Sequence, residues 1–161
     1  MATLVYFGVF DDAQSRLDAE LGANAEAGTS VHQIVKVARR FGLQAEARTE
    51  LTLDDVRRAL AGGAVVIVAV QAWSSAQVKD WQANWEDGHY VVIVGLTDDR
   101  VYVMDPSVRT GYAYLPRGQF IERWHDYDIE GDRRIVWSRL GIIINGTPQI
   151  ARYPAEPTRI E

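Results

Sequence analysis

A histidine and an aspartate stand at the ends of two short apolar segments that follow each other in the chain. His89 opens the segment at residues 90–95, Asp105 follows the segment at residues 101–104, and residues 97–100 form a polar turn between them. Apolar, β-branched segments joined by a short turn predict a β-hairpin. The hairpin would bring both side chains to its open end. An imidazole oriented by a carboxylate is the pair that activates the nucleophile of a catalytic triad.

The nucleophile that would complete such a triad is not evident in the sequence. None of the 161 residues is a cysteine. Ser74, Ser75 and Ser107 lie in predicted loops near the hairpin, but none has the Gly-x-Ser-x-Gly pattern of a nucleophile elbow, and Ser30 is better explained as a helix cap. From the residues alone, His89 is either a general base or a strand-end histidine bonded to the backbone.

A metal site is a weaker hypothesis for the same part of the chain. Its ligands would come from the set His89, His125, Asp105, Asp126 and Asp128. These residues show neither His-x-x-x-His nor paired-carboxylate spacing, which are the usual signatures of a metal site on one element. We therefore predict neither a metal ion nor a cofactor.

Aromatic residues lead into His89 and could form a substrate cleft. Trp73 and Trp85 lie in the polar, aromatic segment at residues 72–88, and Gln71 ends the apolar run before it. Tryptophan rings offer large contact areas to a bound peptide, but they can equally cover a hydrophobic core. We predict Trp73, Trp85 and Gln71 as cleft residues, and we expect residues 124–128 to be a packed connector.

Composition and charge exclude several classes of function. The net charge is −5 and the isoelectric point is about 5.2, and no basic stripe is present, which argues against nucleic-acid binding. The longest apolar run, residues 64–70, is too short to cross a bilayer. No signal peptide is visible, so we expect a cytoplasmic protein, and the sequence gives no indication of its oligomeric state.

The order of the predicted elements is helices first and then mostly strands, which predicts an α+β domain at residues 1–146 and a C-terminal tail at residues 147–161. Glycines and capping boxes predict helices at residues 1–7, 11–22, 31–41 and 53–61, and Pro116 predicts a fifth short helix. The predicted strands are residues 43–48, 64–71, 89–95, 100–104, 111–115 and 139–145. The first helix begins at Met1 with no capping residue, so we expect it to be truncated.

Separated motifs in a consistent order carry a resemblance that runs from residue 1 to about residue 145. They are Gly-Thr-Ser at 28–30, Leu-Thr-Leu-Asp-Asp at 51–55, Val-Ala-Val-Gln-Ala-Trp at 68–73, Asp-Gly-His-Tyr-Val-Val at 87–92, Asp-Pro-Ser at 105–107, and Tyr-Leu-Pro at 114–116 with Trp-His-Asp-Tyr-Asp at 124–128. With these motifs the chain resembles the bacteriocin-processing (double-glycine leader) cysteine peptidase family, and especially its free-standing, C39-like members.

The resemblance implies a papain-like fold in which a helix that bears the nucleophile packs on an antiparallel sheet. It implies that His89 is the general base and Asp105 its orienting partner, and that a peptide or protein is the substrate. The family's catalytic cysteine and oxyanion glutamine have no counterpart here, and both would lie just before Met1. We therefore keep two hypotheses: a cysteine peptidase lacking its nucleophile in this chain, by truncation or by natural loss, and an inactive peptide-docking module of the same fold.

Overall fold

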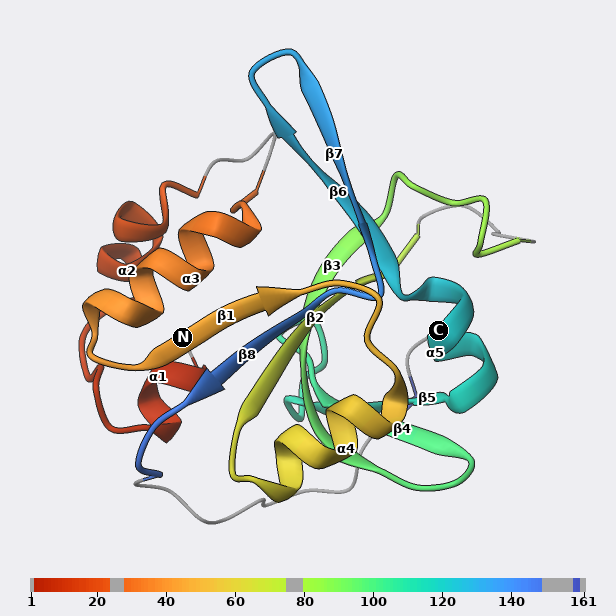
Figure 1. Cartoon of the computed structure of the whole chain (residues 1–161), viewed down its shortest axis with the longest axis horizontal. Helices are drawn as coiled ribbons and strands as arrows, with labels where there is room; N and C mark the ends of the chain where they lie inside the picture. The colour runs from red at the N-terminus through yellow and green to blue at the C-terminus, as the bar shows by residue number, and fades with distance from the viewer. Residues whose placement is uncertain (1, 24–27, 75–79, 149–157, 160–161) are drawn as a thin grey trace.

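A seven-stranded sheet forms the centre of the molecule, and helices cover both of its faces (Figure 1). The structure is a computed structural model that describes residues 2–23, 28–74, 80–148 and 158–159. The strand order is β1-β8-β2-β3-β4-β5-β9, and neighbouring strands are antiparallel except β5 and β9. This is the mixed α and β architecture, with an antiparallel sheet, that the sequence predicts.

The described helices are α1 (Ala2–Tyr6), α2 (Gln14–Leu21), α3 (Val31–Arg40), α4 (Leu53–Ala61) and α5 (Arg117–Arg123). The strands of the large sheet are β1 (Gln44–Arg48), β2 (Val65–Gln71), β3 (Gly88–Leu96), β4 (Arg100–Met104), β5 (Tyr112–Pro116), β8 (Gly141–Asn145) and β9 (Thr158–Arg159). A separate two-stranded sheet pairs β6 (His125–Glu130) with β7 (Arg133–Ser138).

Two helix starts are fixed by the capping residues that the sequence predicts. The Ser30 hydroxyl accepts the backbone N–H of Gln33 at 3.3 Å at the start of α3. Thr52 and Asp55 form a reciprocal capping box at the start of α4. Such contacts satisfy backbone N–H groups that the first helical turn leaves without partners.

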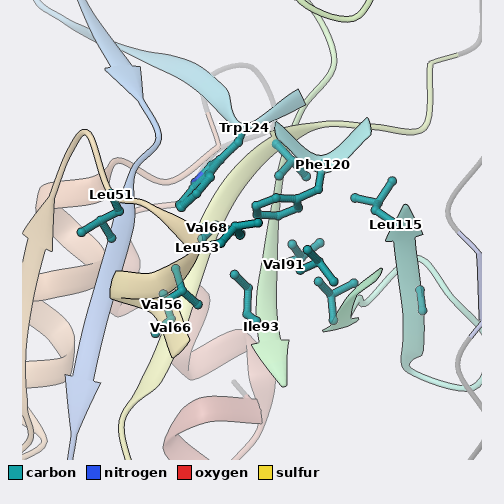
Figure 2. Close-up of a cluster of buried hydrophobic side chains, with 14 of the residues drawn as sticks. Leu51, Leu53, Val56, Val66, Val68, Val91, Ile93, Leu115, Phe120 and Trp124 are labelled. Carbon is teal, nitrogen blue, oxygen red and sulfur yellow. The ribbon is translucent and has the colours of Figure 1, made fainter. Parts of the chain in front are cut away.

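The alternation of side chains along β2 divides the core into two layers. Val66, Val68 and Val70 face the layer with α4 and α5, while Ile67 and Ala69 face the layer with α1, α2 and α3. A strand covered on both faces reads as a continuous apolar run, which is why residues 64–71 predict a buried strand. Figure 2 shows the first layer; it contains Leu51, Leu53, Val56, Val66, Val68, Val91, Ile93, Leu115, Phe120 and Trp124.

The prediction of a packed connector at residues 124–128 is wrong. Trp124 is buried, but the next residues form β6, which pairs with β7 as a hairpin that projects from the body of the molecule (Figure 1). Glu130 pairs with Arg133, so the hairpin loop is Gly131-Asp132. A Gly-Asp pair between two segments is a hairpin signal, but the many charged residues on both sides hide the alternation.

Element boundaries differ from the predicted ones by a few residues. Helix α2 begins at Gln14, not Asp11, because the Asp12 carboxylate is used in the preceding turn, where it accepts the N–H of Ala13 at 2.7 Å. Strand β8 begins at Gly141. Of the predicted tail, Thr158–Arg159 pairs with β5, whereas residues 149–157 and Met1 lie outside the described part of the chain.

Candidate active site

The predicted hairpin of β3 and β4 is present, and it positions the candidate site. Val92 is paired with Met104, and the N–H of Thr97 donates to the carbonyl of Arg100 at 2.9 Å at the closed end. His89 therefore lies near the start of β3, and Asp105 directly follows the last residue of β4. Both residues lie at the open end of the hairpin, which is also where β2 ends.

His89 and Asp105 are in direct contact, as the hairpin predicts. The Nε2 atom of His89 lies 2.8 Å from Oδ1 of Asp105. The aspartate side chain has no exposed surface, whereas 18% of the histidine side chain is exposed. Because Nε2 faces the carboxylate, Nδ1 is the ring nitrogen left to exchange a proton with another group. The geometry is that of an imidazole held by an orienting carboxylate.

Further donors hold the same carboxylate. The backbone N–H of Ser107 donates to Oδ1 at 2.8 Å, and the indole Nε1–H of Trp73 donates to Oδ2 at 3.0 Å. Burial favours the neutral acid, but the hydrogen bonds from His89, Ser107 and Trp73 outweigh it and hold the pKa of Asp105 below its ordinary value. Asp105 is therefore a buried anion that can stabilise positive charge on His89.

The backbone around Asp105 is fixed by a tight loop. The N–H of Asp105 donates to the carbonyl of Gly111 at 2.9 Å, and the N–H of Gly111 donates to the carbonyl of Val108 at 2.8 Å. Gly111 has a φ of 75°, a conformation that glycine adopts without a steric penalty. These bonds fix the aspartate at its position after β4, beside His89.

Gln71 is not placed in a cleft, contrary to its predicted role. Its side chain has no exposed surface. Its amide nitrogen donates to the carbonyl of His125 at 3.1 Å, and its amide oxygen accepts the N–H of Asp87 at 2.9 Å. Gln71 therefore ties β6 and the segment before β3 to the end of β2. The polarity of its side chain serves this internal contact.

The two predicted cleft tryptophans lie in different surroundings. Trp73 is 37% exposed and contacts Asp105 through its indole N–H. Trp85 packs against the ring of His125 with the centroids 4.3 Å apart and the ring planes tilted by 50°, and the guanidinium of Arg134 lies 5.1 Å from the Trp85 centroid. Trp73 thus belongs to the His89–Asp105 site, whereas Trp85 belongs to the base of the β6–β7 hairpin. That either ring contacts a peptide stays a prediction.

A cavity of about 640 Å³ lies next to the site on the side of α1, α2 and α3. Its lining is mostly apolar and includes Leu4, Leu17, Ile34, Tyr90, Asp105 and Pro106. None of the three predicted cleft residues lines it. The sequence signal for this cavity is the apolar face of helix 31–41, which reads equally well as a face that only packs on the sheet.

The other sequence candidates do not form a second site within the described residues. In that part of the chain no three His, Asp or Glu side chains are placed to bind one metal ion, and His125 bonds through Nε2 to the carbonyl of Asn84 at 2.7 Å. Ser107 contributes its backbone N–H to Asp105, and Ser75 lies outside the described residues. No described helix is long and apolar enough to cross a membrane.

Comparison with known structures places this fold among papain-like peptidase domains. The peptidase domain of Streptococcus ComA, described as a bi-functional ABC transporter involved in a quorum-sensing pathway, superposes with a TM-score of 0.61 at 18% identity, covering 89% of this chain and 85% of the other. A putative C39-like peptidase from Bacillus anthracis gives a TM-score of 0.59 at 15% identity, covering 91% and 86%. No curated protein sequence matches this chain.

The sequence itself settles the family. Residues 14–134 match the sequence profile of the peptidase C39 family, and this range includes both His89 and Asp105. The chain belongs to the peptidase C39 family.

Proposed function

We propose that His89 and Asp105 are the base and the orienting acid of a cysteine-peptidase site that acts on a peptide or protein. The observation that carries this proposal is the 2.8 Å contact between His89 Nε2 and the buried, multiply bonded carboxylate of Asp105. A histidine that only capped a strand would have no need of a buried anion. Membership of a peptidase family supports a peptide as the substrate.

The reaction assigned to this pair needs a thiol in addition. His89 Nδ1 would accept the thiol proton, and the thiolate would attack the peptide carbonyl. The imidazolium, stabilised by Asp105, would return the proton to the leaving amine, and water activated by the same nitrogen would hydrolyse the thioester. Since the 161 residues include no cysteine, this polypeptide as given should not hydrolyse peptides by this route.

The apolar cavity beside Asp105 supports binding of a peptide side chain near the pair. A volume of about 640 Å³ falls within the range of small-molecule sites, and apolar walls with a few polar groups are typical of binding pockets. Tyr90, which follows His89 in β3, lines this cavity. A substrate residue seated there would lie beside the strand end that carries His89.

A second candidate function is a peptide-docking domain that binds without cleavage. The absence of cysteine from the 161 residues favours it, because the cleft could be kept after the nucleophile is lost. The two candidates share the fold and the peptide ligand. They differ in whether the His89–Asp105 pair becomes catalytic when a thiol is supplied.

The test compares three proteins in hydrolysis of a peptide library: the chain as given, an extended chain with a glutamine and a Cys-Gly segment placed before Met1 in the family pattern, and the extended chain with His89→Ala. We expect turnover by the extended chain, none by the chain as given, and a loss of about 10²–10⁴-fold when His89 is removed from the extended chain. His32→Ala, which removes an exposed histidine on α3, is the matched control.

Two outcomes would contradict the peptidase proposal. Turnover by the chain as given that disappears with Ser107→Ala would assign the chemistry to a serine. Peptide binding without turnover, in both the given and the extended chain, would favour the docking domain.

A further inference from the structure

We propose that Trp73 is a positioning residue that fixes the Asp105 carboxylate so that its other oxygen faces His89. This inference rests on the proposed function, because it assigns a role to Trp73 in the same site. The contact that carries it joins the indole Nε1–H of Trp73 to Oδ2 of Asp105 at 3.0 Å. The sequence predicts this tryptophan as a wall of the substrate cleft, whereas in the structure its indole N–H donates to Asp105.

The backbone of Trp73 has a positive φ, which is unusual for a bulky residue. Its φ is 62°, in the left-handed region that a bulky side chain rarely adopts. The chain is fixed just before it, where the N–H of Ala72 donates to the carbonyl of Asp87 at 2.9 Å. Conformations of this kind persist where surrounding contacts compensate the strain, and they gather at functional sites. The bond to Asp105 is one contact that holds Trp73 in this conformation.

The two carboxylate oxygens of Asp105 have separate partners. Oδ1 accepts from Ser107 N–H and contacts His89 Nε2, while Oδ2 accepts from Trp73. A carboxylate that is hydrogen-bonded at only one oxygen can rotate about its Cβ–Cγ bond. A donor on the second oxygen restricts this rotation. Because the Asp105 side chain has no exposed surface, loss of the indole N–H would leave Oδ2 without a donor from bulk water.

Packing alone does not account for Trp73. The residue is 37% exposed and is not part of either core layer, so its ring contributes little to the buried core. A residue needed only as a cover would not require an indole N–H aimed at a buried carboxylate. The effect of removing the N–H while keeping an aromatic ring therefore separates positioning from covering.

The first test uses the chain as given with Trp73→Phe. NMR would follow the His89 side-chain nitrogen signals and the Asp105 carboxyl carbon from pH 7 to pH 2. We expect Asp105 to take up its proton, and His89 to lose its partner, at a higher pH than in the unmodified chain. Trp137→Phe, on β7, is the matched control and should leave both signals unchanged. Identical titrations in the Trp73→Phe and unmodified chains would overturn the proposal.

A second measurement does not depend on whether the Trp73→Phe chain folds. In the unmodified chain the indole proton of Trp73 should resonate downfield, exchange slowly with solvent, and shift as Asp105 becomes protonated. Asp105→Asn should move this signal and abolish its dependence on pH. An indole proton that exchanges freely and is insensitive to Asp105 would refute the contact itself.

The extended, cysteine-bearing chain tests the catalytic consequence. Loss of a hydrogen bond to a charged group corresponds to a change of about tenfold or more in the rate of a step that depends on it. Trp73→Phe should therefore lower kcat about tenfold and leave KM nearly unchanged. A rise in KM with unchanged kcat would instead make Trp73 a cleft residue. If the extended chain shows no turnover at all, the proposed function fails, while the NMR titrations still decide the role of Trp73.

Discussion

Two histidines of this chain lie close to aspartates, and they differ in what their rings contact. His89 contacts a carboxylate through Nε2, whereas His125 donates its Nε2–H to the carbonyl of Asn84 and packs against the ring of Trp85. A neutral carbonyl fixes a ring but offers little to a positive charge, while a buried carboxylate stabilises the imidazolium. His89 is therefore suited to proton transfer, and His125 is suited to holding the β6–β7 hairpin in place.

The neighbouring aspartates show the same contrast. Burial opposes the charge on Asp105, yet His89, Ser107 and Trp73 together keep its pKa below the ordinary value. Burial also opposes the charge on Asp126, and here it prevails: the pKa is raised, with Asp128 adding to the effect and only Tyr127 N–H, Gln71 and His125 acting against it. The number and charge of the donors decide whether the pKa of a buried carboxylate lies below or above its ordinary value.

The largest expected effect comes from a substitution near His125, where Gln71 joins β2 to β6. Gln71→Ala removes the partners of the His125 carbonyl, which is buried, and of the Asp87 N–H, which is half-buried. We expect a loss of about 3 kcal/mol in the free energy of unfolding, measured by urea denaturation, with no change in the His89–Asp105 signals by NMR. Gln82→Ala, at an exposed position, is the control and should stay within about 0.5 kcal/mol of the unmodified chain. A disturbed His89 signal would show that the two regions are coupled.

The second prediction compares the two aspartates through their pH dependence. The folded pKa of Asp105 is lowered, so its charge stabilises the fold above the ordinary value of 3.8 and this stabilisation disappears as the pH falls through the folded value. Asp105→Asn should therefore cost about 2 kcal/mol at pH 7, and progressively less in acid.

Asp126 should behave in the opposite way. Its folded pKa is raised, so its contribution to stability is complete below 3.8 and is lost as the pH rises through the folded value. Relative to the unmodified chain, Asp126→Asn should become more favourable as the pH rises. Unfolding free energies of both variants between pH 3 and pH 7 test this, and parallel profiles would contradict the contrast.

The sequence predicts the surroundings of His89 better than those of His125. The β3–β4 hairpin and the contact of His89 with Asp105 follow from two apolar segments and a short turn. The partners of Gln71 have no sequence signal, because its bonds go to residues far along the chain and the charged residues of β6 hide its strand alternation. The sequence indicates Trp73 as a site residue but does not predict its bond to Asp105, because neither its positive φ nor the direction of its indole N–H has a sequence signal.

Gly88 directly precedes His89 and lies against the carboxylate of Asp126, so its replacement should disturb the surroundings of His125. A Cβ atom at this position would lie 2.5 Å from Oδ2 of Asp126, whose carboxylate is held by Tyr127 N–H and by Gln71. Gly88→Ala should therefore displace this carboxylate at a cost of about 1 kcal/mol. Gly118→Ala, in α5 with open space around it, should instead stabilise the protein slightly. An undisturbed Asp126 carboxyl signal in the Gly88→Ala chain would contradict the expectation.

The smallest expected effect on stability comes from Asp128→Asn. Asp128 Oδ2 accepts the N–H of Val31 at 3.0 Å at the start of α3, and an asparagine oxygen can keep that bond while removing the charge. Loss of a negative charge at a helix N-terminus costs up to about 1 kcal/mol. The repulsion from Asp128, which adds to burial in raising the pKa of Asp126, is relieved at the same time. The net loss should therefore be about 0.5 kcal/mol or less. The Asp126 carboxyl signal should titrate at a lower pH in this variant, while that of Asp105 stays where it was. An unchanged Asp126 titration would mean that the charge of Asp128 does not raise the pKa of Asp126. The difference between the pKa values of Asp126 and Asp105 would then come from burial and hydrogen-bond donors, with no contribution from the charge of Asp128.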